Sequence, residues 1–334
     1  PELRPRPVTE IEIRDPDPTA GEPAPAEPAS ESPYKNLLVP LVVVPAMIVM
    51  VLVAVVMLFT SMTGKEDTPR ENLQRLLDGG FNERKQAAFN LVRQVIDARR
   101  SRAEGGVAEW DIDASFLPEL RAARASIGAL ERSEDVPIPL VLSSLLAQLG
   151  DAEGVTQLAE MTGLGDELDP AREYRLYAAM TLGAIGGELA GPEREVAAGT
   201  LIGLLASEDA GMALVAIAGL QNLPASGTVP ALSGMLTSGS LELRGSAALS
   251  LATLGEKRGA AVLREMLAPE VYAAERGADE RRWPAARVSE SRVKALEALA
   301  ALGELSEGEL AGLLADGDAA VRTRALALQA ARAE

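Results

Sequence analysis

The chain has 334 residues and a formal net charge of −17, with 49 acidic side chains against 32 basic ones, and it contains neither histidine nor cysteine. The absence of both residue types excludes serine–histidine and cysteine–histidine nucleophile systems, imidazole or thiolate metal sites, and disulfides. The acidic balance and an aromatic content of only 3% disfavour nucleic-acid binding, because the protein would repel phosphates and offer few rings to bases.

Motifs for small-molecule chemistry are also missing from the sequence. It contains no GxxxxGK[ST] loop, no GxGxxG loop after a strand and no EF-hand loop. We therefore expect no catalytic residue, cofactor, metal or small-molecule substrate, and we predict that the protein is not an enzyme. An enzyme built on this chain would need a pair of carboxylates acting as acid and base in a cleft.

The first element along the chain is an acidic, proline-rich tail over residues 1–34. Proline alternates with small and acidic residues, as in the segment from Pro23 to Pro28. Such a segment has almost no apolar surface to bury, so we predict an extended tail.

The second predicted element is a transmembrane helix over residues 35–62. Its centre, residues 37–59, has 23 residues without a charge. A bilayer core of about 30 Å needs about 20 helical residues at 1.5 Å each, so this segment is long enough to cross it. Tyr34 and Lys35 are expected at one membrane interface and Lys65 at the other.

Basic residues near this predicted span indicate its orientation. Lys35 lies on its N-terminal side, whereas Lys65, Arg70 and Arg75 follow it. The positive-inside rule places the domain that follows in the cytoplasm and the tail on the opposite side. We therefore expect a single-pass protein of a bacterial inner or intracytoplasmic membrane, with the lipid bilayer and other membrane-protein subunits as its partners.

A repeated helical pattern occupies residues 63–334. In most units an anchor residue is followed at positions +3, +4, +7 and +10 by small or aliphatic residues, and often by glycine at +11, while the first and last units match this pattern only in part. These offsets lie on one face of an α-helix, and the glycine favours a left-handed cap. The pattern predicts about seven helix pairs that bury their apolar faces by stacking on one another. The anchors are Arg84, Pro139, Arg175, Ala213, Arg244, Arg292 and Arg322.

The pattern of arginine, two small or aliphatic residues and a terminal leucine–glycine resembles HEAT-like repeats. The shortest anchor spacings, 30 and 31 residues, are similar to the form found in phycobilisome-lyase-like proteins. The resemblance covers about residues 70–332 and implies an all-α fold, in which an α-solenoid of HEAT-like helix pairs follows one transmembrane helix and an extended tail. Members of this family are mostly binding scaffolds, and lyase activity is not expected without cysteine or histidine.

The anchor arginines allow two interpretations. They could form a row that binds a ligand. Alternatively, each could pair with an acidic residue or a helix end of the adjacent repeat, with its aliphatic stem buried, and this structural interpretation is favoured.

The spacing of 48 residues between Arg244 and Arg292 indicates an insertion, which we place at residues 269–288. Exposed aromatic rings beside arginines are typical of interface hot spots. The alternative is a loop folded back on the solenoid, with its tryptophan filling a gap. The predicted protein-interface residues are Tyr272, Arg276, Arg281, Arg282 and Trp283.

These features predict a non-catalytic accessory or scaffold subunit that stabilises a larger multi-subunit membrane complex, of the photosynthetic or respiratory kind. The alternative is a membrane-tethered adaptor or sensor that captures a soluble protein transiently. Both functions use the solenoid surface to bind protein.

Overall fold

The structure, a computed structural model, describes residues 67–110, 112, 115–276, 281 and 283–333. Residues Asp67–Glu334 form one compact unit. The described residues contain fifteen α-helices and three short 3₁₀-helices but no strand. The predicted all-α fold is therefore confirmed for this part of the chain, and its many packed helices are compatible with a helical repeat fold. The predicted domain limits, 1–34, 35–62 and 63–334, stay predictions.

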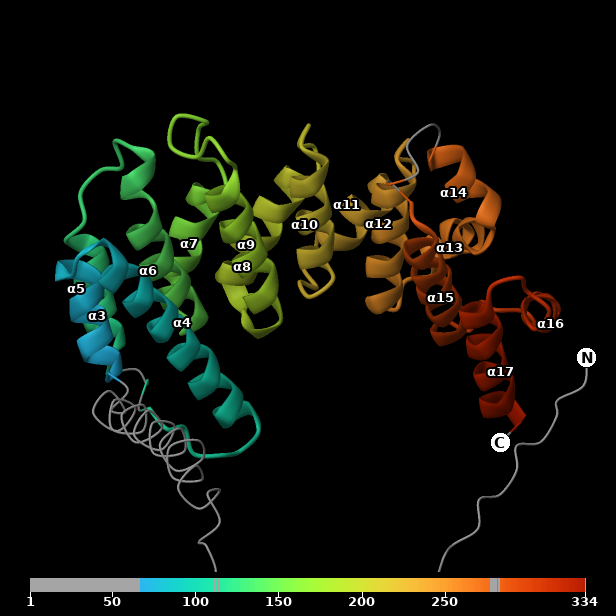
Figure 1. The fold of residues 1–334 in the computed structure, drawn as a ribbon, viewed down its shortest axis with the longest axis horizontal. Coiled ribbons are helices and arrows are strands. Elements are labelled where there is room, and N and C mark those ends of the chain that lie inside the picture. Colours follow the sequence, from blue (N-terminus) through green and yellow to red (C-terminus); the bar gives the residue numbers. More distant parts are fainter. Residues whose placement is uncertain (1–66, 111, 113–114, 277–280, 282, 334) are drawn as a thin grey trace, which may run out of the picture. The chain divides into compact units, whose positions relative to one another are not determined.

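The helices that contain the anchors pack against one another in chain order (Figure 1). This anchor row consists of α4 (Phe81–Ala103), α6 (Pro137–Gln148), α8 (Glu173–Ile185), α10 (Ala210–Leu220), α12 (Leu241–Thr253), α15 (Ala285–Ala301) and α17 (Ala319–Ala333). The remaining helices are α3 (Pro69–Asp78), α5 (Leu117–Ala125), α7 (Ala152–Met161), α9 (Gly191–Leu204), α11 (Thr228–Met235), α13 (Ala260–Leu267), α14 (Pro269–Arg276) and α16 (Glu307–Leu313).

The repeated apolar positions of the anchor row form a large part of the core, together with buried side chains of the other helices. In α8, Ala178, Ala179, Leu182 and Ile185 are all buried, and the equivalent side chains of α10 are buried as well. Burying a leucine or isoleucine contributes about 1.5–3 kcal/mol, so each unit adds to the stability only when its neighbours cover it. Leu326, at position +4 of the last anchor in α17, differs because it is 56% exposed.

Left-handed glycines end three of the anchor helices as predicted. Gly150, Gly255 and Gly303 have φ angles of +81°, +76° and +67°. The residue after each glycine donates its N–H to a carbonyl five residues earlier, at 2.9–3.0 Å, which is the bond of a Schellman cap. The expectation is wrong at Gly186, whose φ is −52° because the helix continues there into the short 3₁₀-helix Gly186–Glu188.

No helix in the described part of the chain is both long enough and apolar enough to span a bilayer. The longest of them, α4, has 23 residues, but eight of its side chains are charged. The predicted localisation, a single-pass protein of a bacterial membrane, is corrected by this finding and is not carried forward. The predicted span over residues 37–59, with Tyr34, Lys35 and Lys65 at its ends, lies outside the described residues.

Helices α8 and α10 approach each other closely at Gly183 and Gly219. A Cβ atom added to Gly183 would lie 2.5 Å from the Cα atom of Gly219, too close for any real contact. We expect Gly183→Ala to lower the free energy of unfolding by about 1–3 kcal/mol, because the two helices must move apart. Chemical denaturation would measure this change.

The control for this substitution is Gly199→Ala in α9. Gly199 is also helical, but an added Cβ would meet nothing within 4 Å. Because alanine is the better helix former by about 1 kcal/mol, this variant should be as stable as the wild type or more stable. Equal effects of the two substitutions would contradict the close approach at Gly183.

Candidate protein-binding site

The anchor arginines have structural partners rather than a free, ligand-binding arrangement. Each donates a hydrogen bond to an earlier backbone carbonyl, which lies at a helix end for Arg84 and Arg292 and in the segment before the anchor helix for the other three. The bonds are Arg84 Nη2 to Leu77 O (2.9 Å), Arg175 Nη2 to Asp169 O (3.0 Å), Arg244 Nη1 to Gly239 O (3.0 Å), Arg292 Nε to Leu267 O (2.7 Å) and Arg322 Nη1 to Asp316 O (2.5 Å).

Arg292 shows how the insertion is accommodated. The carbonyl of Leu267 lies 25 residues before Arg292, whereas the other anchors bond to carbonyls five to seven residues earlier. The buried guanidinium also forms two bonds to Asp316, at 3.0 and 2.5 Å. Its hydrogen bond lowers the pKa of the Asp316 carboxyl below the ordinary value. The inserted residues therefore lie between α13 and α15 without breaking the hydrogen bond from the anchor Arg292 to the Leu267 carbonyl.

The predicted interface loop is largely helical and its aromatic rings are buried. Residues 269–276 form α14, and α15 begins at Ala285. Trp283 is only 4% exposed and packs edge-to-face on Tyr272, with 4.9 Å between ring centroids. The Tyr272 hydroxyl donates to the Met266 carbonyl at 2.9 Å, and burial raises the pKa of Tyr272 to about 12. The expectation of exposed rings is thus wrong, and the alternative of a segment folded back on the solenoid agrees with the structure.

The arginines of this segment lie in different environments. Arg276 is half-buried at the end of α14, and Arg281 is exposed. Arg282 lies outside the described residues. The guanidinium of Arg287 lies over the Trp283 ring, 4.5 Å from its centroid, and covers its outer side. That these residues form a protein interface stays a prediction.

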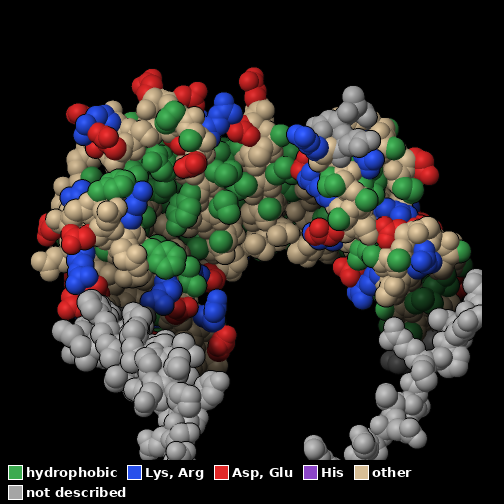
Figure 2. Space-filling view, in the orientation of Figure 1, with side chains coloured by type: hydrophobic (Ala, Val, Ile, Leu, Met, Phe, Trp, Pro, Cys, Tyr) green, Lys and Arg blue, Asp and Glu red, His purple; other side chains and the backbone are tan. Residues whose placement is uncertain are grey.

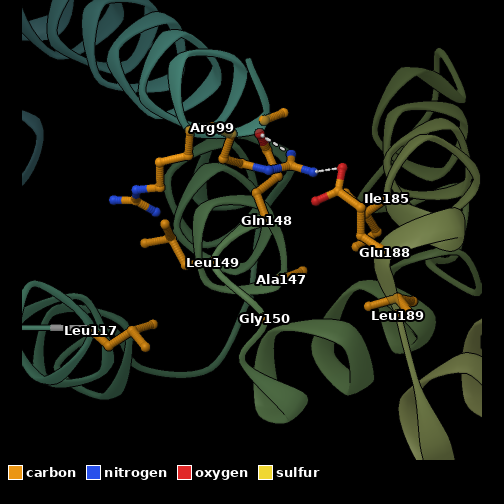
Figure 3. A pocket seen from close by; sticks show the side chains of 11 residues that line it. Arg99, Leu117, Ala147, Gln148, Leu149, Gly150, Ile185, Glu188 and Leu189 are labelled. Carbon is orange, nitrogen blue, oxygen red and sulfur yellow. Dashed lines mark hydrogen bonds and ion pairs between the residues drawn. The ribbon is translucent and has the colours of Figure 1, made fainter. Parts of the chain in front are cut away.

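A hollow of about 590 Å³ lies where α4, α6 and the 3₁₀-helix after α8 meet. Figure 3 shows Arg99 between Gln148 and Glu188 at this hollow. Arg99 donates to Gln148 Oε1 at 3.4 Å and forms an ion pair with Glu188, while Arg102 donates to the carbonyl of Ile112. Both guanidinium groups therefore have partners from the chain itself, so the hollow is a structural junction and a weak candidate for an anion site.

The strongest candidate for a binding surface is an uncharged face on the middle of the anchor row. In α6, α8, α10 and α12, none of the forty residues at positions +1 to +10 after the anchor is charged, although charged residues make up 24% of the chain. Positions +2, +5 and +9 lie opposite the buried stripe, and the side chains there are exposed or half-buried, except Ser144, which is fully buried. This uncharged face consists of Val141, Gln148, Tyr177, Met180, Ala184, Val215, Ala218, Asn222, Ser246, Leu249 and Thr253.

Two side chains of α8 are the most prominent members of the uncharged face. Met180 is 55% exposed and Tyr177 is also exposed. Figure 2 shows hydrophobic side chains gathered over α8 and toward α10. Hydrogen bonds between successive helices hold the face together: Asn222 Nδ2 donates to Gly183 O at 3.5 Å, and Ser250 Oγ donates to Ile217 O at 3.2 Å.

The uncharged face ends where charges return on both sides. The equivalent positions carry Arg93 in α4, Lys294 and Glu297 in α15, and Arg324 in α17. Reading the sequence for its buried stripe alone misses this face. The same seven anchors, read at +2, +5 and +9, would have revealed it, because the lack of charge is visible without a structure.

Comparison with known proteins adds little to this picture. No protein-family model matches the chain, and neither does any curated protein. Among solved structures, a complex of human deoxyhypusine hydroxylase with glycerol is similar, with 19% sequence identity over 78% of this chain and 94% of that chain, and a TM-score of 0.27.

This match corrects the prediction that the chain is not an enzyme. The matched protein is an enzyme by its name, so absence of activity is not proposed below. Because the TM-score is only 0.27, neither that activity nor a site is inferred for this chain from the match. Within the described residues, no group of three acidic side chains is placed to hold a metal ion.

Proposed function

We propose that the repeat domain is a scaffold of HEAT-like helix pairs that holds a protein partner against the uncharged face. The observation that carries the proposal is the run of four neighbouring helices without a charge at positions +1 to +10. Helices packed 8–10 Å apart make such a face about 30 Å wide.

The chemistry of this face suits a protein partner. The centres of protein interfaces are depleted in charged residues and enriched in tyrosine and methionine, and the face has both of the latter at Tyr177 and Met180. Because the side chains of this face carry no charge, a partner can cover them without desolvating an ion, and the desolvation cost of binding is small. The hydrogen-bonded helices beneath the face are already ordered, which reduces the entropy lost when a partner binds.

The proposed role is that of a scaffold subunit in a larger multi-subunit assembly, with the transient adaptor as the alternative. Purification from native cells, followed by identification of co-purifying chains by mass spectrometry, distinguishes them. A scaffold subunit should bring stoichiometric partners through size-exclusion chromatography, whereas an adaptor should elute alone. A solitary chain at every step would overturn the scaffold role.

Met180→Glu in the uncharged face should release the partner. A glutamate at the centre of an apolar interface must be desolvated without a matching charge, so we expect about a 30-fold or greater loss of affinity, corresponding to about 2 kcal/mol or more. Recovery of the stoichiometric partners by the purified variant would measure this effect.

Val196→Glu is the matched control. Val196 is also an exposed aliphatic side chain, but it lies on α9, outside the anchor row. This variant should keep the partners, and both variants should unfold at the wild-type temperature because the replaced side chains are exposed. Equal loss of partners from both variants would contradict binding at the uncharged face.

A further inference from the structure

Helix α4 carries an exposed stripe that combines hydrophobic and basic side chains. It consists of Phe81, Lys85, Phe89, Arg93, Ile96 and Arg100, all exposed. Their spacing places them within about a third of the helix circumference. Phe81 is 73% exposed and Phe89 is 66% exposed, which is unusual for side chains of this size.

The charge of α4 is opposite to that of the rest of the chain. The helix has six basic and two acidic residues, a net charge of +4, whereas the whole chain has a net charge of −17. The stripe itself contains three basic residues and no acidic one. The ammonium group of Lys85 lies 4.3 Å from the centroid of the Phe81 ring, so charge and apolar surface are directly adjacent.

We propose that the α4 stripe binds an acidic amphipathic helix of a protein partner, whose apolar residues cover Phe81, Phe89 and Ile96 while its carboxylates meet Lys85, Arg93 and Arg100. This inference rests on the proposed function and deepens it. Phe89 and Arg93 occupy positions +5 and +9 after Arg84, so the stripe continues the outward side of the anchor row.

The length and charge of the stripe define the partner. From Phe81 to Arg100 the helix rises by about 28 Å, which matches a partner helix of about 18 residues. Basic side chains beside apolar ones at helical spacing are complementary to a helix with leucine and glutamate on one face.

Two other occupants fit the charges less well. An anionic bilayer would attract α4 but repel the remaining chain, whose net charge without α4 is −17 − 4 = −21. A second copy joined head to tail would bring α4 to α17, which has three arginines and no acidic residue, so like charges would meet.

The test uses the full chain and two synthetic 18-residue peptides with leucine along one face, one flanked by glutamates and the other by lysines. Binding is measured by fluorescence anisotropy at low and at physiological salt. The wild type should bind the glutamate peptide and not the lysine peptide. The triple variant K85E/R93E/R100E should reverse this preference, with a loss of about tenfold or more for the glutamate peptide.

A second variant and a control protect the test from effects on folding. The double variant Phe81→Ser/Phe89→Ser removes most of the apolar surface of the stripe. It should lower the affinity for the glutamate peptide by about tenfold. The unfolding temperature should not change, because both rings are exposed. Arg132→Glu reverses a highly exposed charge outside α4 and should leave peptide binding unchanged.

Several results would overturn the proposal. The wild type could fail to bind the glutamate peptide, or Arg132→Glu could lower the affinity for that peptide as much as the stripe variants do. The chain could also bind anionic phosphatidylserine vesicles in place of the peptide, or it could self-associate in a way that the stripe variants abolish. The peptide assay contains no native partner. Its failure therefore removes the α4 site alone, while the proposed function is judged separately by co-purification.

Discussion

Arg292→Met is expected to lower the free energy of unfolding by about 3–5 kcal/mol. The guanidinium of Arg292 is buried and forms two hydrogen bonds to Asp316 and one to the carbonyl of Leu267. Methionine keeps most of the side-chain volume, so the loss comes from the carboxylate and the carbonyl left without their donor. Chemical denaturation of the full chain would measure the change. A loss below about 1 kcal/mol would show that water replaces the donor and that the contact contributes little.

Arg132→Met is the control for this substitution. Arg132 pairs with Glu134 and Asp135, but its side chain is highly exposed, and such ion pairs contribute about 0–1 kcal/mol. The large effect of Arg292→Met should therefore arise from burial and not from the removal of an arginine in itself.

The same contact gives the stability a pH dependence. The bond from Arg292 lowers the folded-state pKa of Asp316 below its ordinary value of 3.8. A carboxyl with a lowered folded-state pKa contributes stability that is fully present above the unfolded-state pKa and is lost as pH falls through the folded-state pKa. The difference in stability between wild type and Arg292→Met should therefore be constant near neutral pH and shrink below pH 3.8.

Trp283→Ala is the second change with a large expected effect, a loss of about 3–5 kcal/mol in the free energy of unfolding. The indole fills the space between Tyr272 and the anchor row, and removing it leaves a cavity and uncovers the Tyr272 ring. Hydrogen exchange should show the loss of protection concentrated in α12 to α15, the helices whose residues lie around the indole.

Trp283→Phe tests the cause of that loss. Phenylalanine keeps a ring against Tyr272 and below Arg287, and it removes an indole N–H that has no hydrogen-bond acceptor among the described residues. We expect this variant to lose less than about 1.5 kcal/mol. An equally large loss for both variants would contradict the packing explanation, and an unchanged stability of Trp283→Ala would show that the ring is not part of the core.

Local patterns predicted much of the repeat domain. The buried positions of α8 and α10 follow from offsets of +3, +4, +7 and +10, because helix periodicity depends only on the backbone of the same segment. The left-handed caps at Gly150, Gly255 and Gly303 follow from the missing Cβ of glycine, which is also a local property. The partners of the anchor arginines could be foreseen in kind, since a long side chain can reach acidic residues and backbone carbonyls of the neighbouring segments.

The burial of Tyr272 and Trp283 could be learned only from the tertiary structure. The same aromatic and arginine residues suit an exposed interface or a segment folded back on the solenoid, because composition does not say which surface lies opposite a ring. The glycine contact between Gly183 and Gly219 likewise depends on which helices become neighbours.

By itself, the sequence determined the buried face of helices such as α8 and α10, where three of the helices end, and that no charge interrupts four successive units. Only the tertiary structure decided that these four units lie side by side as one face, and that the aromatic rings of residues 269–288 lie in the core. The physical reason is the distance along the chain over which each kind of interaction acts. Periodicity and caps arise within one turn of helix, whereas burial of an inserted segment and continuity of a surface depend on packing between helices far apart in the chain.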